Sequence, residues 1–322
     1  MANIDIIGLG AMNIDHLYQV DKIVTDGEQL ATDYKSLPGG SAANTIYGLG
    51  KLGIKTGFIS AIGTDANGKK LIEDFGAANV DTSQIKFKDG SSTGSVLCLS
   101  DKSNKRALYV SPGANNLLTP DDISLTYSNQ ARIVHFSSFA HDKQFDIQVD
   151  LAKQLGPSIK VSLAPGMIYA SKGLTALKPL LHRTDIIFMN REEIEQLTAR
   201  DFAAGARECL AQGCHIVVVT LGRGLITEKG NTIIGYIRDI ENEYHIESLA
   251  GDEIPEPETT GAGDAFAAGF LFGFLRGKPI DKCGLLGDIM ACFAISAVGA
   301  REGLPSLAQL SERYFQRSGE PL

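Results

Sequence analysis

The sequence contains no long apolar run and no excess of positive charge. Its 38 acidic residues outnumber its 30 basic ones, which gives a formal net charge of −8 and an isoelectric point near 5.3. A nucleic-acid-binding surface is normally basic, so we expect no nucleic-acid partner. No apolar stretch is long enough to span a bilayer, and no basic segment precedes the first apolar run. We therefore expect neither a membrane segment nor a signal peptide.

Cysteine is also scarce, and its spacing argues against the common cysteine motifs. The five cysteines are an odd number and form no Cys-x-x-Cys pair. Metal sites and disulfide frameworks are usually built from paired cysteines. We interpret these residues as small buried thiols in a reducing compartment, and we expect a cytoplasmic protein.

What the sequence has instead is a regular alternation of short apolar runs and helix-compatible segments. Its 322 residues suffice for a large core. Apolar, unalternated strands between helices are typical of a parallel sheet covered on both faces, so we predict an α/β fold with a mostly parallel central sheet flanked by helices on both faces. The predicted strands are 4–8, 58–62, 133–136, 160–163, 185–189 and 216–220, and the predicted helices are 41–52, 68–78, 145–155, 173–181, 192–198, 202–212, 264–275 and 284–298.

Two segments interrupt this alternation. Residues 15–37 and 92–111 contain alternating apolar and polar positions without intervening helices. This pattern predicts antiparallel strands with one solvated face, which would form a small β-sheet lid over a site. No linker or internal repeat divides the chain, so we expect one domain over residues 1–322. Apolar lid strands can pair between subunits, and a homodimer through the lid is a further prediction.

The segment from Glu258 to Asp264 combines glycines, threonines and a carboxylate directly before an apolar helix. A tight turn here would direct the free N–H groups of Gly261, Ala262 and Gly263 at one point, beside the positive end of the helix dipole. Asp264 would lie next to this anion site, where a carboxylate can take a proton from an attacking hydroxyl. The dipole would keep Asp264 ionised as a weak base. The alternative is an ordinary helix start in which Asp264 only offsets the dipole.

Two further polar motifs occur in the first fifty residues. Asn13 and Asp15 follow the first predicted strand, where open α/β sheets bind ligands, and could clasp neighbouring hydroxyls. Gly39 and Gly40 precede a helix and allow close backbone approach to a ligand, with Asn44 in the first turn. A polar turn and a glycine-rich helix start are the alternatives. A dinucleotide fingerprint at 8–13 is disfavoured, because Asn13 replaces the last glycine and no helix follows.

Two more motifs follow strands in the second half of the chain. Asn190 and Glu193 are three residues apart after strand 185–189, so one helical turn places them on one face, where they suit a hydrated Mg²⁺. The alternative is an N-cap asparagine with acidic first-turn residues. Thr220 and Gly222 follow strand 216–220 and suit phosphate contact, whereas the alternative is a simple hairpin turn.

These five motifs occur in the order and approximate spacing of the ribokinase-like (PfkB) carbohydrate kinase family, which the chain resembles from Asn13 to Ser306. The resemblance implies that Asp264 is the catalytic base and that Gly261, Ala262 and Gly263 bind the transferring phosphoryl group. It also implies three binding sets. The acceptor set is Asn13, Asp15, Gly39, Gly40 and Asn44; the nucleotide set is Asn190, Thr220 and Gly222; and Glu193, with Asn190, organises Mg²⁺.

The chain departs from the family pattern at several positions. Glu258 replaces the usual aspartate of a monovalent-cation loop, so potassium dependence is an open question, and the nucleotide turn after Thr220 is one residue short. Ribokinases carry Lys-Gly where this chain has Ser41 and Ala42, and an acidic residue where it has Ser137 and Ser138. These differences weaken a ribose-specific reading.

The resulting hypothesis is ATP-dependent, Mg²⁺-assisted phosphorylation of a primary hydroxyl on a small sugar, as in ribokinases and fructokinases. The first alternative is a nucleoside kinase of the same family, which an apolar pocket near Met12, Leu17 or Phe139 would favour. The more distant alternative is a catalytically silent sugar-binding sensor.

Overall fold

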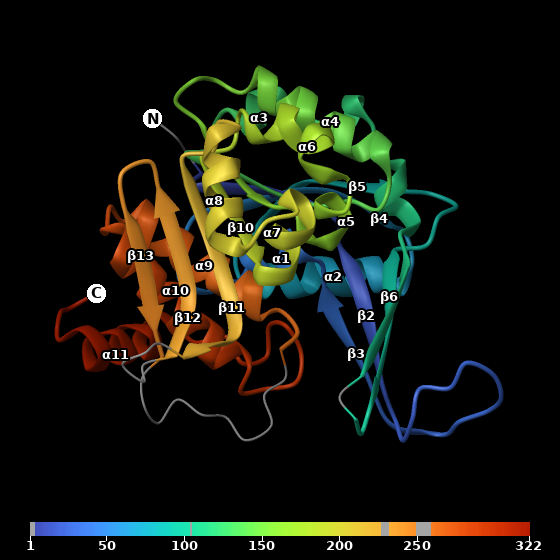
Figure 1. The fold of residues 1–322 in the computed structure, drawn as a ribbon. Helices are drawn as coiled ribbons and strands as arrows, with labels where there is room; N and C mark the ends of the chain where they lie inside the picture. Colours follow the sequence, from blue (N-terminus) through green and yellow to red (C-terminus); the bar gives the residue numbers. More distant parts are fainter. Residues whose placement is uncertain (1–3, 104, 227–231, 249–258) are drawn as a thin grey trace.

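A large twisted sheet forms the centre of the molecule (Figure 1). The computed structural model describes residues 4–103, 105–226, 232–248 and 259–322. In this part of the chain the main sheet has nine strands, in the order β13 (Glu243–Glu247), β12 (Thr232–Asp239), β11 (Ile216–Ile226), β10 (Ile186–Asn190), β9 (Lys160–Ala164), β8 (Ile133–Ser137), β1 (Ile6–Leu9), β4 (Thr56–Gly63) and β5 (Asp81–Lys88). Neighbours from β11 to β5 pair in parallel, and β12 and β13 add an antiparallel edge.

Helices cover both faces of this sheet, as the sequence predicts. One apolar cluster packs α1, α2, α9, α10 and α11 against one face, and a second packs α4, α6, α7 and α8 against the other. Ile6 belongs to the first cluster and Ile7 to the second, because successive side chains of a strand point to opposite faces. The helices are α1 (Ser41–Lys51), α2 (Ala66–Ala77), α3 (Leu125–Ser128), α4 (Asp142–Gln154), α5 (Gly166–Ala170), α6 (Gly173–Leu181), α7 (Arg191–Thr198), α8 (Phe202–Ala211), α9 (Ala262–Leu275), α10 (Ile280–Ala294) and α11 (Leu307–Ser318), with the 3-10 turns η1 (Gly113–Leu117) and η2 (Pro120–Asp122). Among the helices of the described residues, none has both the length and the apolarity needed to cross a bilayer.

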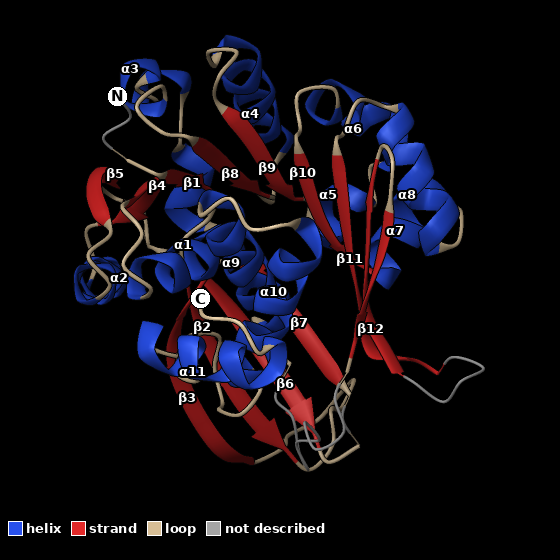
Figure 2. Ribbon diagram, turned by 90° about the vertical axis from the view of Figure 1, so that its left-hand side faces the viewer, coloured by secondary structure: helices blue, strands red, loops and turns tan. Residues whose placement is uncertain are grey.

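A second, smaller sheet projects from the main one (Figure 2). Its order is β3 (Ala31–Gly39), β2 (Asn13–Val20), β6 (Gly94–Asp101) and β7 (Arg106–Ser111). The outer pairs are antiparallel, but the central pair, β2 and β6, is parallel, which corrects the expectation of a purely antiparallel sheet. The reason lies in the connections. β2 follows β1 and β6 follows β5, and both of these precursors run the same way in the main sheet.

Strand β11 extends further than the sequence predicts. Instead of ending at Thr220 it continues to Ile226, and its pairing with β12 is interrupted between Thr220 and Leu225 by an irregularity in register. Gly222 and Gly224 lie in this stretch, both with positive φ. The turn residues that seemed to end the strand instead bend it, as glycines in a bulge do.

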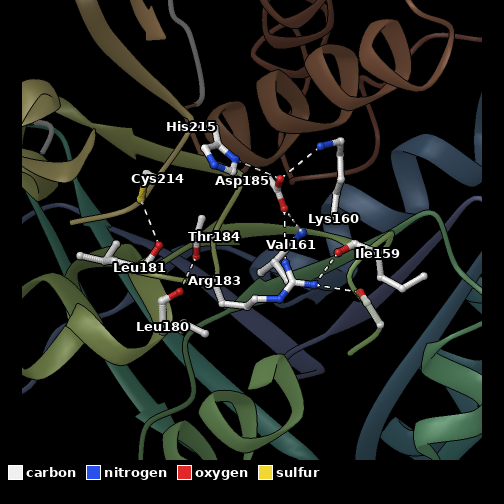
Figure 3. A network of polar contacts seen from close by, with 11 residues as sticks. Ile159, Lys160, Val161, Leu180, Leu181, Arg183, Thr184, Asp185, Cys214 and His215 are labelled. Carbon is white, nitrogen blue, oxygen red and sulfur yellow. Dashed lines mark hydrogen bonds and ion pairs between the residues drawn. The ribbon is translucent and has the colours of Figure 1, made fainter. Parts of the chain in front are cut away.

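A polar network joins the starts of three neighbouring strands at the edge opposite the strands' carboxyl ends (Figure 3). Asp185, directly before β10, accepts hydrogen bonds from Lys160 Nζ at 3.1 Å and from the Val161 N–H at 2.8 Å. Its carboxylate also lies 3.2 Å from His215 Nδ1 and 3.6 Å from Arg183 Nη1. The side chain of Asp185 is 12% exposed, so this carboxylate is held by direct ionic contacts with little solvent around it.

Candidate active site

A cavity of about 100 Å³ lies where the carboxyl ends of β9, β10 and β11 meet the start of α9. Asn190 and Thr220 are aligned on neighbouring strands at this edge, since they are register partners of β10 and β11. The cavity is lined by Ser41, Ala164, Gly166, Phe188, Met189, Asn190, Glu193, Val218, Thr220, Gly263, Asp264 and Phe266. Five residues that the sequence singled out therefore share one cavity: Asn190, Glu193, Thr220, Gly263 and Asp264.

Asp264 is held at the cavity wall by two neutral donors from α1. The hydroxyl of Ser41 donates to Oδ1 at 2.7 Å, and the amide of Asn44 donates through Nδ2 to Oδ2 at 2.8 Å. Thr45 on α1 donates its side-chain hydroxyl to the backbone carbonyl of Asp264 at 3.2 Å, which ties α1 to the first turn of α9. Both carboxylate oxygens thus have fixed directions.

The acidity of Asp264 differs from the expectation of a weak, dipole-stabilised base. Burial raises its pKa to about 6, whereas the hydrogen bonds from Asn44 and Ser41 and the charge of Arg301 act in the opposite direction. Desolvation, which disfavours the charged form, outweighs these hydrogen bonds and this charge. At neutral pH the group is still mostly ionised, and it is a stronger base than an exposed aspartate.

The turn before α9 is built differently from the predicted set of three free N–H groups. The N–H of Ala262 donates to the Thr259 carbonyl at 3.3 Å, so it is already used within the turn. Gly261 has a φ of 77°, and a Cβ at this position would lie 2.5 Å from the Cβ of Ala300. Beside Gly263, in contrast, a Cβ would meet nothing within 4 Å. Open space at this turn therefore lies beside Gly263, which also lines the cavity.

Asn190 and Glu193 form the start of α7. The side chain of Asn190 accepts from the Glu193 N–H at 2.9 Å, and the Glu193 carboxylate accepts from the Asn190 N–H at 2.9 Å. This reciprocal capping box is the structural alternative that the sequence left open. Burial raises the pKa of Glu193, the Asn190 N–H lowers it, and the negative charge of Asp264 raises it further. The two carboxylates of the cavity therefore repel one another.

Asp15 and Gly39 lie on the neighbouring strands β2 and β3 of the small sheet, where Gly39 pairs with Asn13 and Asp15 with Leu37, next to the start of α1. A Cβ on Gly39 would lie 2.3 Å from Asp15 Oδ2, so only glycine leaves room for this carboxylate. Burial raises the pKa of Asp15 to about 6; the charge of Arg301 opposes the shift and that of Asp264 adds to it. Among the described residues no partner donates to Asp15 Oδ1, although this oxygen is buried.

Four other predicted positions lie away from the cavity or outside the described residues. The side-chain oxygen of Asn13 accepts from Asn115 Nδ2 at 2.9 Å. Gly222 lies beyond the end of the cavity on β11, and a Cβ there would meet nothing within 4 Å. Gly40 is the N-cap of α1. Glu258, the position of the possible monovalent-cation loop, lies outside the described residues.

Sequence reasoning missed three residues that contact the predicted set: Ser41, Asn115 and Arg301. Ser41 was noted only as a departure from a family motif, yet its hydroxyl contacts Asp264. Asn115 also binds the backbone of Met12, accepting from its N–H at 3.0 Å. Arg301 donates to Asn44. Ser41 lies within the motif from Gly39 to Asn44, but no periodicity or motif spacing marks Asn115 or Arg301, because they reach the site through contacts between distant parts of the chain.

Another cavity, of about 490 Å³, lies near the opposite edge of the sheet and includes Arg132, Lys160 and Leu275 among its lining residues. Its two cations form ion pairs, Arg132 with Asp5 at 3.3 Å and Lys160 with Asp185 at 3.1 Å. The smaller cavity is the better candidate for chemistry, because it holds two carboxylates whose pKa values are raised.

The chain is similar to known proteins in sequence and in fold. The model of the pfkB family carbohydrate kinases matches residues 3–307. An uncharacterized sugar kinase of Archaeoglobus fulgidus is 36% identical over 259 residues, covering 80% of this chain and 98% of that protein. A nucleoside kinase of Methanocaldococcus jannaschii is 26% identical and covers 95% of both chains. The crystal structure of ribokinase from Thermotoga maritima superposes with a TM-score of 0.80 at 22% identity, covering 98% of this chain and all of that one, and shows the same fold. The chain therefore belongs to the pfkB family of carbohydrate kinases and is a phosphotransferase that acts on hydroxyl groups.

Proposed function

We propose that the protein transfers the γ-phosphoryl group of ATP to a primary hydroxyl of a small sugar. In this reaction Asp264 accepts the hydroxyl proton, the hydroxyl oxygen bonds to the γ-phosphorus, and the bond from phosphorus to the bridging oxygen breaks to release ADP. The observation that carries the proposal is the position of Asp264. It is partly buried, oriented by Ser41 and Asn44, and shares a cavity with Asn190, Glu193 and Thr220.

The acceptor would lie on the small-sheet side of Asp264. Asp15 has a buried oxygen that can accept from a sugar hydroxyl, and Gly39 leaves the space for it. Asn44 contacts Asp264 directly, so it connects acceptor binding to the base. Gly40 and Asn13 complete the proposed acceptor set, and Asn13 would act through its position beside Asn115.

The nucleotide would approach from the ends of β10 and β11, where Asn190 and Thr220 face each other. The turn of Gly261, Ala262 and Gly263 would receive the γ-phosphoryl group, with Gly263 on the open side. Gly222, further along β11, would contact the nucleotide outside the cavity. Positioning and charge stabilisation would supply most of the catalysis, because phosphoryl transfer passes through a loose transition state.

Magnesium fits the donor set of the cavity. The described residues contain no group of three or more His, Cys, Asp and Glu side chains that could hold a metal ion alone. The cavity offers carboxylate oxygens from Glu193 and Asp264, which repel one another, and the amide of Asn190. Mg²⁺ prefers such oxygens, keeps several waters and is completed by phosphates. When bound with ATP it would neutralise charge on the transferring group, with Glu193 and Asn190 as its protein side.

The small sheet would act as a lid over the acceptor. Residues 15–37 and 92–111 contribute its four strands, and closure would exclude water and limit ATP hydrolysis.

The exposed apolar side chains of β7, such as Leu108 and Tyr109, support pairing with a second subunit. One domain over residues 1–322 and a cytoplasmic location remain predictions.

The nucleoside acceptor is the second candidate, and the 26% identical nucleoside kinase favours it. Of the three residues that would favour a base, however, Met12 and Phe139 are buried in the core at 0% and 1% exposure, which leaves Leu17. Leu17 lies on the same face of β2 as Asp15. A silent sugar sensor is disfavoured by the fixed geometry of Asp264.

The test is ADP release from ATP and Mg²⁺ in the presence of pentoses, hexoses, sugar phosphates and nucleosides. A sugar that stimulates the wild type but not Asp264→Asn would support the proposal. Stimulation by nucleosides alone would support the second candidate. If no compound stimulates release while sugars still bind in a calorimetric titration, the protein is a sensor and the proposal is wrong.

A further inference from the structure

Arg301, in the loop between α10 and α11, is a buried cation for which the reaction above has no role. Its side chain is 2% exposed and forms an ion pair with Asp74. The guanidinium lies over the rings of Tyr47 and Phe75, 5.0 and 5.3 Å from their centroids. Burying a charge is costly unless every donor has a partner, so this position is specifically built for a guanidinium.

The remaining donors of Arg301 point to the candidate site. Nε donates to Asn44 Oδ1 at 2.9 Å, and Nη2 donates to the Gly39 carbonyl at 3.3 Å. The bond to Asn44 decides which way its amide faces. Because Oδ1 accepts from Arg301, Nδ2 is directed at Asp264 Oδ2, 2.8 Å away. The flipped amide would oppose two donors at Arg301 and two acceptors at Asp264.

We propose that Arg301 is a positioning residue for phosphoryl transfer, which fixes the Asn44 amide toward Asp264 and the Gly39 peptide beside Asp15. The inference rests on the proposed function and deepens it. Arg301 touches neither reacting group itself. It joins the acceptor side of the site, through Gly39, to the catalytic carboxylate, through Asn44.

The charge of Arg301 supports the same role. It lowers the pKa of both Asp15 and Asp264 against the effect of burial. The other charged groups at this set are acidic: Asp74 acts on Arg301, Glu302 acts on Tyr47, and Glu193 is itself affected by the charge of Asp264. Arg301 is thus a counter-charge shared by both sides of the site.

Lysine cannot replace this arrangement. A single ammonium retains the charge beside Asp74, but it lacks the planar fork that reaches Asp74, Asn44 and Gly39 together. We expect Arg301→Lys to lower kcat about 10- to 100-fold, in the range of a misplaced catalytic group. The KM for ATP should change less than about threefold, because Asn190 and Thr220 do not contact Arg301.

A double-mutant cycle with Asn44→Ala separates positioning from a general structural effect. If Arg301 acts through Asn44, the double variant should lose no more than about threefold beyond the worse single variant. The inference is wrong if the reductions in kcat of the two single variants multiply in the double variant. It is also wrong if Arg301→Lys keeps the kcat of the wild type.

Arg317→Lys is the matched control. Arg317 is also buried, with its side chain 3% exposed, pairs with Asp288 and donates to the Glu247 carbonyl at 3.3 Å, but it has no hydrogen bond to Asn44, Gly39 or Asp264. It should lose a similar amount of thermal stability to Arg301→Lys while its kcat stays within about twofold of the wild type. Equal kcat losses in both variants would reduce Arg301 to a structural role.

A second readout does not depend on turnover. In ¹³C NMR titrations of aspartate carboxyl groups, assigned with Asp264→Asn, Arg301→Met should raise the pKa of Asp264, because the charge of Arg301 lowers it. Failure of the proposed function would appear as a wild type without acceptor-stimulated ADP release, with this shift still present. An unshifted Asp264 in an active, folded protein would overturn the inference alone.

Discussion

Two carboxylates at opposite edges of one sheet are held in opposite ways. Asp185 contacts Lys160 and Arg183 directly, together with a backbone N–H (Figure 3). Asp264 receives its hydrogen bonds from the neutral side chains of Ser41 and Asn44. The cation Arg301 is hydrogen-bonded to Asn44 and reaches Asp264 through it. Two cations hold Asp185 by direct ion pairs, whereas neutral donors orient Asp264 and burial, by raising its pKa, leaves it able to take a proton. On this difference we base the prediction that Asp185 is a structural carboxylate and Asp264 a catalytic one.

The largest expected effect comes from removing the charge at the catalytic edge. Asp264→Asn should lower kcat by a factor of about 10² to 10⁴, because a general base typically contributes this much. The amide can keep its contacts, with its oxygen toward Asn44 and its NH₂ toward Ser41. ATP binding, measured by calorimetry, should remain. Near-wild-type turnover would show that Asp264 is not the base. The proposed difference between Asp264 and Asp185 would then be wrong.

The matched change at the other edge should act on stability instead. Asp185→Asn leaves Lys160 and Arg183 without their counter-charge, so we expect a loss of about 2 kcal/mol in the free energy of unfolding, the usual scale for hydrogen bonds to a charged group. Urea unfolding measures it. Turnover well below the melting temperature should stay within about twofold. A large loss of kcat without a loss of stability would contradict the prediction that Asp185 serves stability and Asp264 serves catalysis.

Gly39→Ala tests the acceptor side of Asp264. A Cβ 2.3 Å from Asp15 Oδ2 must displace the carboxylate or the backbone. We expect the KM for the acceptor to rise at least about tenfold, the value of one charge-assisted hydrogen bond, and the KM for ATP to stay nearly constant. Initial-rate kinetics with both substrates varied distinguish the two. Equal changes in both KM values would indicate a general distortion.

The pH dependence should show the ionisation of the catalytic edge. Asp264 and Asp15 both have pKa values of about 6, so kcat/KM should fall below pH 6, by between ten- and a hundredfold per pH unit.

Stability should respond in the other direction. The folded pKa of Asp264 exceeds the value of 3.8 for a free aspartate, so its ionisation costs stability as the pH rises from about 4 to about 6. Asp264→Asn should accordingly be at least as stable as the wild type at pH 7. A flat activity profile down to pH 5 would contradict these values.

The smallest effect is expected from His215→Ala. Its imidazole lies 3.2 Å from Asp185 but is 62% exposed, and exposed pairs contribute less than about 1 kcal/mol. The free energy of unfolding should change by less than that amount. A loss as large as that of Asp185→Asn would mean that His215, and not Lys160 and Arg183, holds this carboxylate.

The sequence predicts the parts of the molecule that depend on local patterns. Apolar runs locate the central strands, and the glycines before Asp264 mark the start of α9. It does not predict β12, β13 or the parallel pairing of β2 and β6, because edge strands are only half apolar and pairing depends on the path of the whole chain.

The same limit applies to the site. Asn190 and Glu193 carry a local cap signature, so their mutual contact is readable from spacing alone. Arg301 reaches Asn44 across 257 positions, and no periodicity encodes such a contact. The raised pKa of Asp264 is equally invisible, because burial by neighbouring helices, not the dipole of its own helix, decides it.

Strand β10 has Asp185 immediately before it and Asn190 as its last residue. Five peptide steps at about 3.3 Å separate them by roughly 16 Å, about twice the screening length of physiological salt. Surface charges added around Asp185 would therefore be attenuated before they reach the nucleotide end. Thermal stability could therefore be raised by adding ion pairs around Asp185, at the edge where the parallel strands begin. Such changes would leave the charges around Asp264, at the other edge, nearly unaffected.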